Sequence, residues 1–272
     1  MIEIFVMTSK REKWCCTLLE DLKAQASKVK CNIRVFHDAF ENESYKSVQD
    51  FCNANENFYY YRTKENMGKL NFWIFNNLMY TFLDTLKFDY YIQIPDDVVL
   101  CENFINRSID NVKGIIDICN FFTFNIHKST YMTYQRELIN GVEYWKNNWV
   151  DCCFVAKEKA IKGMKIKKPF RRIESKYKHR GSGVGHEFTE VLKEKGIMAY
   201  QRIYALMEHI GAFETAMHDA ERAKTFYGVS LTLYDLKNYN KKMEFALLHN
   251  LEAKDKDYLF KKIHKLLKAG KI

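Results

Sequence analysis

Residues 90–97 read Tyr-Tyr-Ile-Gln-Ile-Pro-Asp-Asp, and they give the clearest indication of the fold. The run before Pro95 is apolar except for Gln93, which is typical of a strand covered on both faces. Two adjacent carboxylates, Asp96 and Asp97, follow it directly. Such a pair is costly unless a cation or hydrogen bonds compensate it, and hard oxygen ligands suit Mg²⁺ or Mn²⁺. A surface turn or helix N-cap is the alternative, because Pro-Asp commonly opens turns.

Strands and helices alternate on either side of this stretch. Short apolar runs predict strands at 2–7, 31–37, 58–61 and 90–94, and helical spacing predicts helices at 14–22 and 70–86. This alternation predicts an α/β fold, with a parallel sheet flanked by helices on both faces. Ligands of such sheets lie beyond the carboxyl ends of the strands. The polar residues Thr8 to Arg11, Asp38 and Asp96-Asp97 follow strands, so we expect them at one edge of the sheet.

The second half of the chain has a weaker pattern. Strands are expected at 120–125, 149–155 and 198–201, with a polar, loop-rich stretch between the first two and a helix at about 187–195. Gly181-Ser-Gly-Val-Gly185 lacks the Gly-Lys-Ser/Thr ending of a phosphate-binding loop, so we expect a flexible lid. Residues 236–271 are expected to form two amphipathic, Lys-rich helices.

The composition is that of a folded globular protein of 272 residues, with 47% hydrophobic and 28% charged residues. Only 2 Pro and 11 Gly are present, so no linker rich in either separates two domains. We expect one domain at 1–212 and a basic helical extension packed on it at 213–272. The 8 Cys lack a CxxC motif, which favours free thiols in a reducing cytoplasm. No apolar stretch approaches the roughly 20 residues of a transmembrane helix, and a cytoplasmic location is expected.

The formal net charge is +9, and residues 162–180 are especially basic. An excess of this size indicates a polyanionic partner such as DNA, RNA or anionic lipid. A Lys-rich, solvated surface explains the same charge equally well.

The apolar strand followed by Pro-Asp-Asp-Val resembles the DxD-type motif of glycosyltransferases with the GT-A fold, in which a mixed, mostly parallel sheet is flanked by helices. The resemblance implies that Asp97 holds a divalent metal and that Asp96 contacts the nucleotide ribose or the metal shell. The usual pattern in that family is Asp-x-Asp or Glu-Asp-Asp. Here Pro95 stands at the first position, so only two carboxylates are available.

Further segments resemble the same family, in the same order, over roughly residues 2–212. The resemblance implies that Thr8, Ser9 and Arg11, after the first strand, form a nucleotide-binding loop. It implies that Asp38, after the second strand, reads uracil or its equivalent. It also implies that the segment Asn66-x-Gly68-Lys69 lies beside the diphosphate. The run from Gly183 to Gly211 resembles the C-terminal half of N-acetylglucosaminyltransferase-like enzymes, in which a His before Ile-Gly, here His209, completes the metal or diphosphate site. A satisfied structural histidine is the alternative role for His209.

Two carboxylates are candidates for the general base of an inverting transferase, which takes the proton of the acceptor hydroxyl. Glu187 begins a predicted helix, and its family position favours it, although helix N-termini often carry Glu for electrostatic reasons alone. Asp151, in Trp149-Val-Asp151, resembles the stretch that lines the acceptor site. If the reaction retains configuration, neither residue need be a base.

The sequence therefore predicts a glycosyltransferase, monomeric or homodimeric, that uses Mn²⁺ or Mg²⁺ and a nucleoside-diphosphate sugar, with a UDP-sugar favoured. The basic charge favours DNA with hydroxymethylated pyrimidines as the acceptor, as in phage-like glycosyltransferases. A bacterial surface glycan or lipid-linked sugar is the second candidate. A non-enzymatic nucleic-acid-binding protein would leave Asp96-Asp97 unexplained, and a nucleotidyltransferase would need a Gly-rich loop that is missing.

Overall fold

The computed structural model describes residues 1–40, 43–121, 135–147, 150, 153–169, 183–202 and 206–209. The strands are β1 (Ile2–Thr8), β2 (Cys31–His37), β3 (Phe58–Arg62), β4 (Tyr90–Pro95), β5 (Val98–Leu100), β6 (Ile118–Asn120), β7 (Gln135–Ile139), β8 (Val142–Asn147), β9 (Phe154–Lys157), β10 (Ala199–Arg202) and β11 (Met207–His209). The helices are α1 (Glu12–Ala26), α2 (Lys46–Ala54), the 3₁₀ turn η1 (Lys69–Asn71), α3 (Phe72–Asp84), α4 (Phe104–Val112), α5 (Glu158–Ile161) and α6 (Val184–Glu194).

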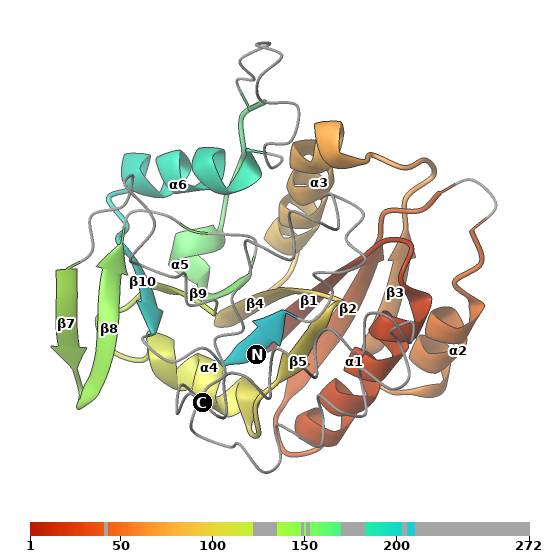
Figure 1. Ribbon diagram of the computed structural model, residues 1–272, viewed down its shortest axis with the longest axis horizontal. Helices are drawn as coiled ribbons and strands as arrows, with labels where there is room; N and C mark the ends of the chain where they lie inside the picture. Colours follow the sequence, from red (N-terminus) through yellow and green to blue (C-terminus); the bar gives the residue numbers. More distant parts are fainter. Residues whose placement is uncertain are drawn as a thin grey trace, which may run out of the picture.

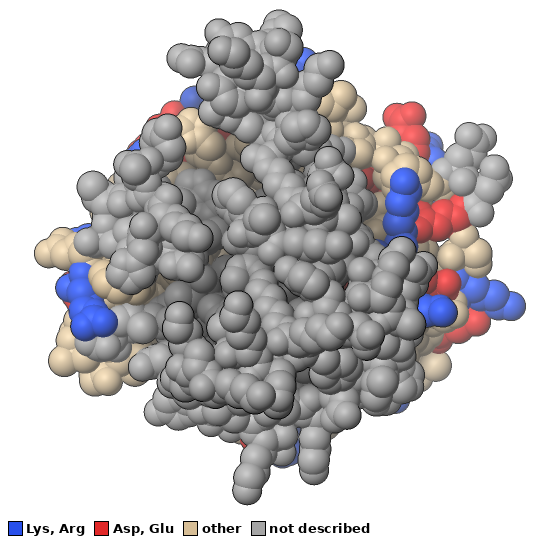
Figure 2. Space-filling model, viewed as in Figure 1, with Lys and Arg blue, Asp and Glu red and all other residues tan. Residues whose placement is uncertain are grey.

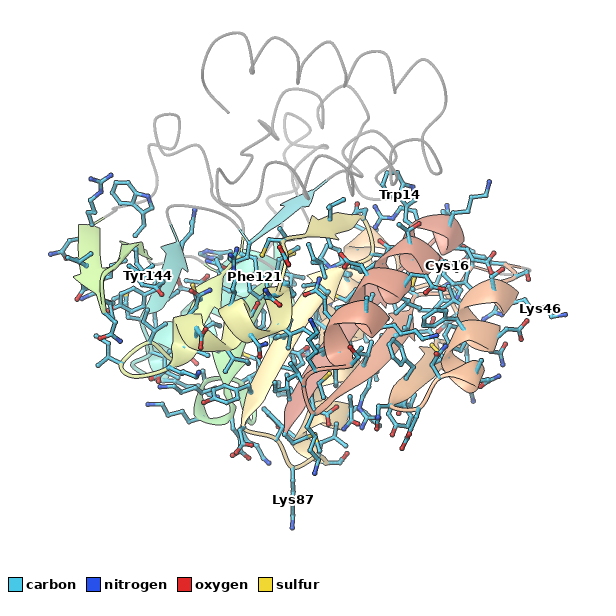
Figure 3. All side chains as sticks on the ribbon, turned by 90° about the horizontal axis from the view of Figure 1, so that it is seen from below. Trp14, Cys16, Lys46, Lys87, Phe121 and Tyr144 are labelled. Atoms are coloured by element: carbon cyan, nitrogen blue, oxygen red, sulfur yellow. The ribbon has the colours of Figure 1, made fainter. Side chains whose placement is uncertain are left out.

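The described strands form a nine-stranded sheet in the order β3-β2-β1-β4-β9-β6-β10-β8-β7, accompanied by the short pair β11-β5 (Figure 1). Seven of the nine strands run in one direction, and β8 and β9 run in the other. Figure 3 shows Lys46 of α2 and Tyr144 of β8 toward opposite ends of the molecule. The expected α/β fold with a mixed, mostly parallel sheet is confirmed.

Helices cover both faces of this sheet. Alternate side chains of β1 point to opposite faces: Ile4 and Val6 pack in one hydrophobic core with α1, α2 and α4. Phe5 and Met7 pack in the other core with α3, α5 and α6. The two cores explain why β1 and β4 read as apolar runs, because neither face of these central strands is open to water.

Gln93, the polar residue within β4, lies in a buried hydrogen-bond network. Its side chain is fully buried, its Oε1 accepts from the hydroxyls of Tyr80 (3.0 Å) and Tyr91 (2.8 Å), and its Nε2 donates to Asn76 Oδ1 (3.1 Å). Asn76 and Tyr80 belong to α3, so these bonds fix α3 against the strand that precedes Asp96. A buried polar group that is fully paired specifies one packing arrangement.

The second half of the sheet differs from the sequence prediction. The stretch expected to be loop-rich contains the antiparallel hairpin β7–β8, so that expectation is wrong for residues 135–147. Asn140 (φ 52°) and Gly141 (φ 76°) form its turn, and Asn-Gly is the dipeptide that favours such hairpins. β9 begins later than expected and lies antiparallel between β4 and β6, while β6 begins two residues earlier than expected.

Several smaller elements were not expected either. Helices α2 and α4 and strand β5 are additions, and α6 begins at Val184, so Gly185 is helical and does not belong to a lid. Residues 181 and 182, the expected extension at 213–272 and the domain boundary at 212 lie outside the described residues. The seven cysteines within the described ranges are free, and none of the described helices could cross a membrane.

Candidate active site

The carboxyl ends of β2, β1 and β4 meet at one edge of the sheet. These strands are parallel neighbours, with β1 in the middle. The backbone N–H of Asp38 donates to the carbonyl of Thr8 (2.9 Å), and that of Asp96 donates to the carbonyl of Met7 (3.0 Å). The residues that follow the three strands are thus brought together, as predicted from the sequence.

Asp96 and Asp97 share one guanidinium. Nη2 of Arg11 lies 2.7 Å from Asp96 Oδ1, and Nη1 of Arg11 pairs with Asp97 Oδ2. Arg11 immediately precedes α1, so the β1–α1 loop carries it to the end of β4. The guanidinium thus bridges the two carboxylates, with one terminal nitrogen toward each, which its planar fork of N–H groups allows.

Two hydroxyls complete what we call the carboxylate cluster, namely Thr8, Arg11, Tyr45, Asp96 and Asp97. Thr8 Oγ1 donates to Asp96 Oδ2 (2.6 Å), and the hydroxyl of Tyr45 lies 2.9 Å from Thr8 Oγ1. Because Thr8 has one hydroxyl hydrogen and gives it to the carboxylate, Tyr45 must donate to Thr8. The Tyr45 oxygen in turn accepts the backbone N–H of Arg11 (2.6 Å), and the ion pair between Arg11 and Asp96 closes the ring of contacts.

The cluster is buried, and burial changes its electrostatics. The residues Asp96 and Asp97 are each 1% exposed. Burial raises the pKa of Asp96; the charge on Arg11 opposes that rise, the neighbouring Asp97 adds to it, and the pKa remains well above its ordinary value. Burial also opposes the charge on Arg11, but the two carboxylates outweigh it and raise the pKa of Arg11. Arg11 is therefore permanently charged between its two partners.

Asp38 holds the turn that precedes α3. Its two carboxylate oxygens accept the backbone N–H groups of Met67 (2.6 Å) and Gly68 (3.1 Å), and its carbonyl accepts from Asn66 Nδ2 (3.0 Å) and Ser9 Oγ (2.8 Å). Gly68 has φ 59° and ψ −175°, a backbone conformation that essentially only glycine adopts. Asn66, Gly68 and Asp38 thus form one unit beside Ser9.

Tyr45 is a member of the site that sequence reasoning missed. It lies between β2 and α2, where no periodic pattern marks it, so only the fold brings it to Thr8 and Arg11. Its ring stacks on the imidazole of His37 at 3.7 Å between centroids. His37 is fully buried and pairs with the hydroxyl of Tyr60 (2.7 Å) and with Glu43 Oε2 (3.0 Å).

The other predicted site residues are placed less fully. His209 pairs across β11–β5 with Val98, so its backbone lies opposite the residue that follows Asp97; its side chain is not among the described ones. Lys69 begins η1, and its side chain is likewise not described. Glu187 lies half-buried in the first turn of α6. Asp151 lies outside the described residues.

The carboxylate cluster suits a divalent cation only in part. Within the described residues no group of three His, Cys, Asp or Glu side chains could hold a metal ion. Mg²⁺, however, is often bound by one or two carboxylates together with substrate phosphates. Asp96 and Asp97 would meet that requirement only without the Arg11 guanidinium between them. A cation bound there would offset the charge of a departing diphosphate.

Comparison with solved structures identifies the fold. A crystal structure of GalNAc-T7 with UDP, GalNAc and Mn²⁺ matches 90% of this chain and 47% of that chain, at a TM-score of 0.54 and 11% identity. S. aureus TarS 1-349 matches with a TM-score of 0.47 at 10% identity (94% of this chain, 68% of that one), and A197 from STIV with 0.42 at 11% (76% and 84%). No protein-family model and no curated protein matches the sequence. The similarity to GalNAc-T7 shows that the chain has the GT-A fold and spans about half the length of that protein.

Proposed function

We propose that this protein is a glycosyltransferase that moves a sugar from a nucleoside-diphosphate sugar to an acceptor hydroxyl. The observation that carries the proposal is the carboxylate cluster, in which two buried aspartates share one arginine at the carboxyl end of β4. A sheet of this type binds its ligands at that edge. The same edge of a GT-A fold is where the sequence resemblance puts the donor diphosphate.

The described residues suggest a division of roles. Asp97, with Asp96 beside it, would hold Mg²⁺ or Mn²⁺. The backbone of His209 in β11 pairs with Val98 of β5, the residue that follows Asp97, so His209 is the candidate for a further metal ligand. The unit formed by Asp38, Asn66 and Gly68, with Ser9 and Lys69, would receive the nucleotide, for which a UDP-sugar is favoured. The carboxylate of Asp38 already holds two backbone N–H groups, so a base edge would use its remaining lone pairs.

The acceptor hydroxyl needs a base if the reaction inverts configuration. Glu187 is the candidate among the described residues, because it is half-buried at the start of α6 on the face of the sheet that also carries α3. Asp151 is the other candidate. Replacing each by its amide and measuring transfer separately from donor hydrolysis assigns the role, since loss of the base impairs attack by the acceptor.

The distribution of charge favours a polyanionic acceptor, for which we propose DNA with hydroxymethylated pyrimidines. Residues 170–182 contain 5 Lys or Arg and 1 Glu, and residues 210–272 contain 12 Lys or Arg and 8 Asp or Glu. The described lysines near α5 and α6, in contrast, largely pair with carboxylates, as Lys162 does with Glu158 and Lys167 with Glu194. Figure 2 likewise shows basic and acidic side chains interspersed along the right-hand rim. The two segments together account for +8 of the formal net charge of +9, and the dense basic run at 170–182 favours a nucleic-acid contact.

The donor half of the proposal is tested with a panel of nucleoside-diphosphate sugars and Mn²⁺, by measuring hydrolysis and binding. Asp97→Asn should lower donor turnover by roughly 100-fold or more, because charge stabilisation of the leaving group is lost. Asp110→Asn is the matched control, since Asp110 is exposed in α4 and pairs only with the neighbouring Lys113 among the described residues. Failure to bind any nucleoside diphosphate would overturn the proposal.

The acceptor half needs its own measurement. Transfer to hydroxymethylated DNA should appear as a mass increase of one sugar per modified base, and DNA binding should weaken steeply with salt. Sugar transfer to a surface glycan or lipid-linked acceptor, with no product on DNA, would favour the second acceptor class. Salt-dependent DNA binding without any donor binding would indicate a non-enzymatic nucleic-acid-binding protein.

A further inference from the structure

Arg11 lies where a cation between Asp96 and Asp97 would lie. Each carboxylate gives one oxygen to the same guanidinium, and the aspartate side chains are at most 2% exposed. Water therefore screens these charges poorly, and the carboxylates need a compensating cation whenever both are ionised. A guanidinium and a divalent cation cannot both occupy the space between the same two oxygens.

The backbone of Arg11 is fixed independently of its guanidinium. Its N–H donates to the hydroxyl of Tyr45 (2.6 Å), and its carbonyl accepts the N–H of Cys15 (3.0 Å), the bond that opens α1. Arg11 can therefore leave the carboxylates by rotating its side chain, without a change in the loop. The side chain is 13% exposed, so it is not completely enclosed in this position.

One atom of Arg11 is unsatisfied in this position. Its buried Nε has no hydrogen-bond partner in the described structure. A buried donor without an acceptor costs free energy, and an anion that accepts from the guanidinium edge would recover it. A diphosphate is such an anion, because arginine binds phosphate oxygens through two parallel bonds.

We infer that Arg11 is a built-in counter-ion that keeps Mg²⁺ or Mn²⁺ off Asp96 and Asp97 until a diphosphate draws its guanidinium away. The role of the diphosphate rests on the proposed function, whereas the competition between Arg11 and the cation does not. The guanidinium compensates the buried carboxylates in the free protein and binds phosphate in the complex. Cation and diphosphate then strengthen each other's binding by the same factor.

The competition is tested with Mn²⁺ alone, by calorimetric titration and by the shift of the melting temperature. Arg11→Gln should bind Mn²⁺ about 10- to 100-fold more tightly than the unchanged protein, which corresponds to the loss of a charge-assisted competitor. Lys13→Gln is the matched control. Lys13 is exposed and lies two residues from Arg11, so this substitution removes the same charge without a change at the carboxylates. Equal Mn²⁺ affinity in Arg11→Gln and the unchanged protein overturns the inference.

UDP serves as the diphosphate probe in a second arm. UDP should tighten Mn²⁺ binding in the unchanged protein, and this factor should shrink in Arg11→Gln, because no guanidinium remains to be moved. An undiminished factor in Arg11→Gln contradicts the inference. If the unchanged protein does not bind UDP at all, the proposed function fails, while the Mn²⁺ titration still decides whether Arg11 competes with the cation.

Arg11→Lys keeps the test decisive if Arg11→Gln does not fold. A lysine ammonium is a compact charge with a shorter reach and lacks the planar fork by which the two Nη atoms of Arg11 contact separate carboxylates, so it is the weaker competitor. Arg11→Lys should therefore bind Mn²⁺ more tightly than the unchanged protein, and an unchanged affinity counts against the inference.

Discussion

The two halves of the sheet bury different kinds of side chain. In the parallel half, β3-β2-β1-β4, the buried polar residues include ionisable groups on or just after the strands, namely Glu3, Arg34, His37, Asp38, Asp96 and Asp97. In the other half, β9-β6-β10-β8-β7 with its helices, the described buried polar residues are neutral, namely Ser108, Asn111, Asn120, Thr189 and Gln201.

This difference indicates that the parallel half carries the functional site and that the other half supports it. Burying an ionisable group is costly unless partners or a ligand compensate it. Glu3 and Arg34 compensate each other as an ion pair, whereas Asp38, Asp96 and Asp97 gather at the carboxyl ends of the strands. Neutral amides and hydroxyls are satisfied by ordinary hydrogen bonds, as Thr189 Oγ1 is by accepting from Val150 N (2.9 Å) and donating to Gly185 O (2.7 Å). Such clustering of ionisable groups is typical of functional sites.

Removing one member of a buried ion pair should have the largest effect on stability. Arg34 Nε lies 2.7 Å from Glu3 Oε2, and the side chains are 10% and 2% exposed. Arg34→Leu leaves the Glu3 carboxylate without its cation, and we expect a loss of about 3 to 5 kcal/mol in the free energy of unfolding. Denaturant unfolding measures it, and Glu3→Leu combined with Arg34→Leu should recover part of the loss.

The matched change in the other half is Thr189→Val. It keeps the shape of the side chain and removes a hydroxyl bound to two backbone groups, so we expect a loss of about 1 to 3 kcal/mol. A loss as large as that of Arg34→Leu would contradict the contrast between the halves.

Gly68→Ala should act on stability and on donor binding together. The backbone at φ 59° and ψ −175° excludes other residues, and an added Cβ would lie 3.2 Å from Asn66 Oδ1, so we expect a loss of about 1 to 3 kcal/mol. Gly141→Ala, in the β7–β8 turn, also strains a positive φ but touches no site residue. Gly141→Ala should therefore lower the melting temperature and leave the affinity for UDP unchanged. A fall in UDP affinity in Gly141→Ala would contradict the predicted difference between the two glycines.

Tyr45→Phe should have a smaller effect on stability, of about 1 to 2 kcal/mol. The ring still stacks on His37, but the backbone N–H of Arg11 loses its acceptor and Thr8 loses its donor. Because this bond anchors Arg11, the affinity for UDP should fall as well. Tyr60→Phe is the control, since Tyr60 hydrogen-bonds to His37 outside the carboxylate cluster. Equal effects of the two substitutions on UDP binding would show that Tyr45 has no specific role in the site.

The smallest expected effect is a pH dependence from His37. Burial lowers the pKa of His37; Glu43 opposes this, and the charge on Arg62 adds to it. His37 stacks on Tyr45 and bonds Tyr60, so these groups surround it. As the pH falls through the ordinary histidine range, the unfolded chain gains a proton that the folded protein does not, so stability falls. Unfolding measured at pH 7 and pH 5 should show a smaller fall for His37→Asn, and an equal fall would exclude His37 as its source.

The parallel half could be predicted from the sequence because its signals are local. Apolar runs at β1, β2 and β4 end at polar residues, and the rule that parallel strand ends share an edge brings Thr8, Asp38 and Asp96 together. The β7–β8 hairpin carried an equally local signal in Asn140-Gly141, which was overlooked. The position of β9 has no local sequence signal, because the insertion of an antiparallel strand between β4 and β6 depends on how the strands pack in the folded protein.

The α/β class, the strand ends that carry the site and the two carboxylates at its centre could all be predicted from local sequence patterns. The compensation of those carboxylates, in contrast, depends on contacts that form when the chain folds. Arg11 reaches both of them across 85 and 86 positions of the chain, and Tyr45 anchors Arg11 from an irregular segment. No local pattern encodes such contacts, because they depend on distances between strand ends that exist only once the sheet has formed. The physical state of the site, a buried pair holding a single guanidinium, is therefore a property of the fold.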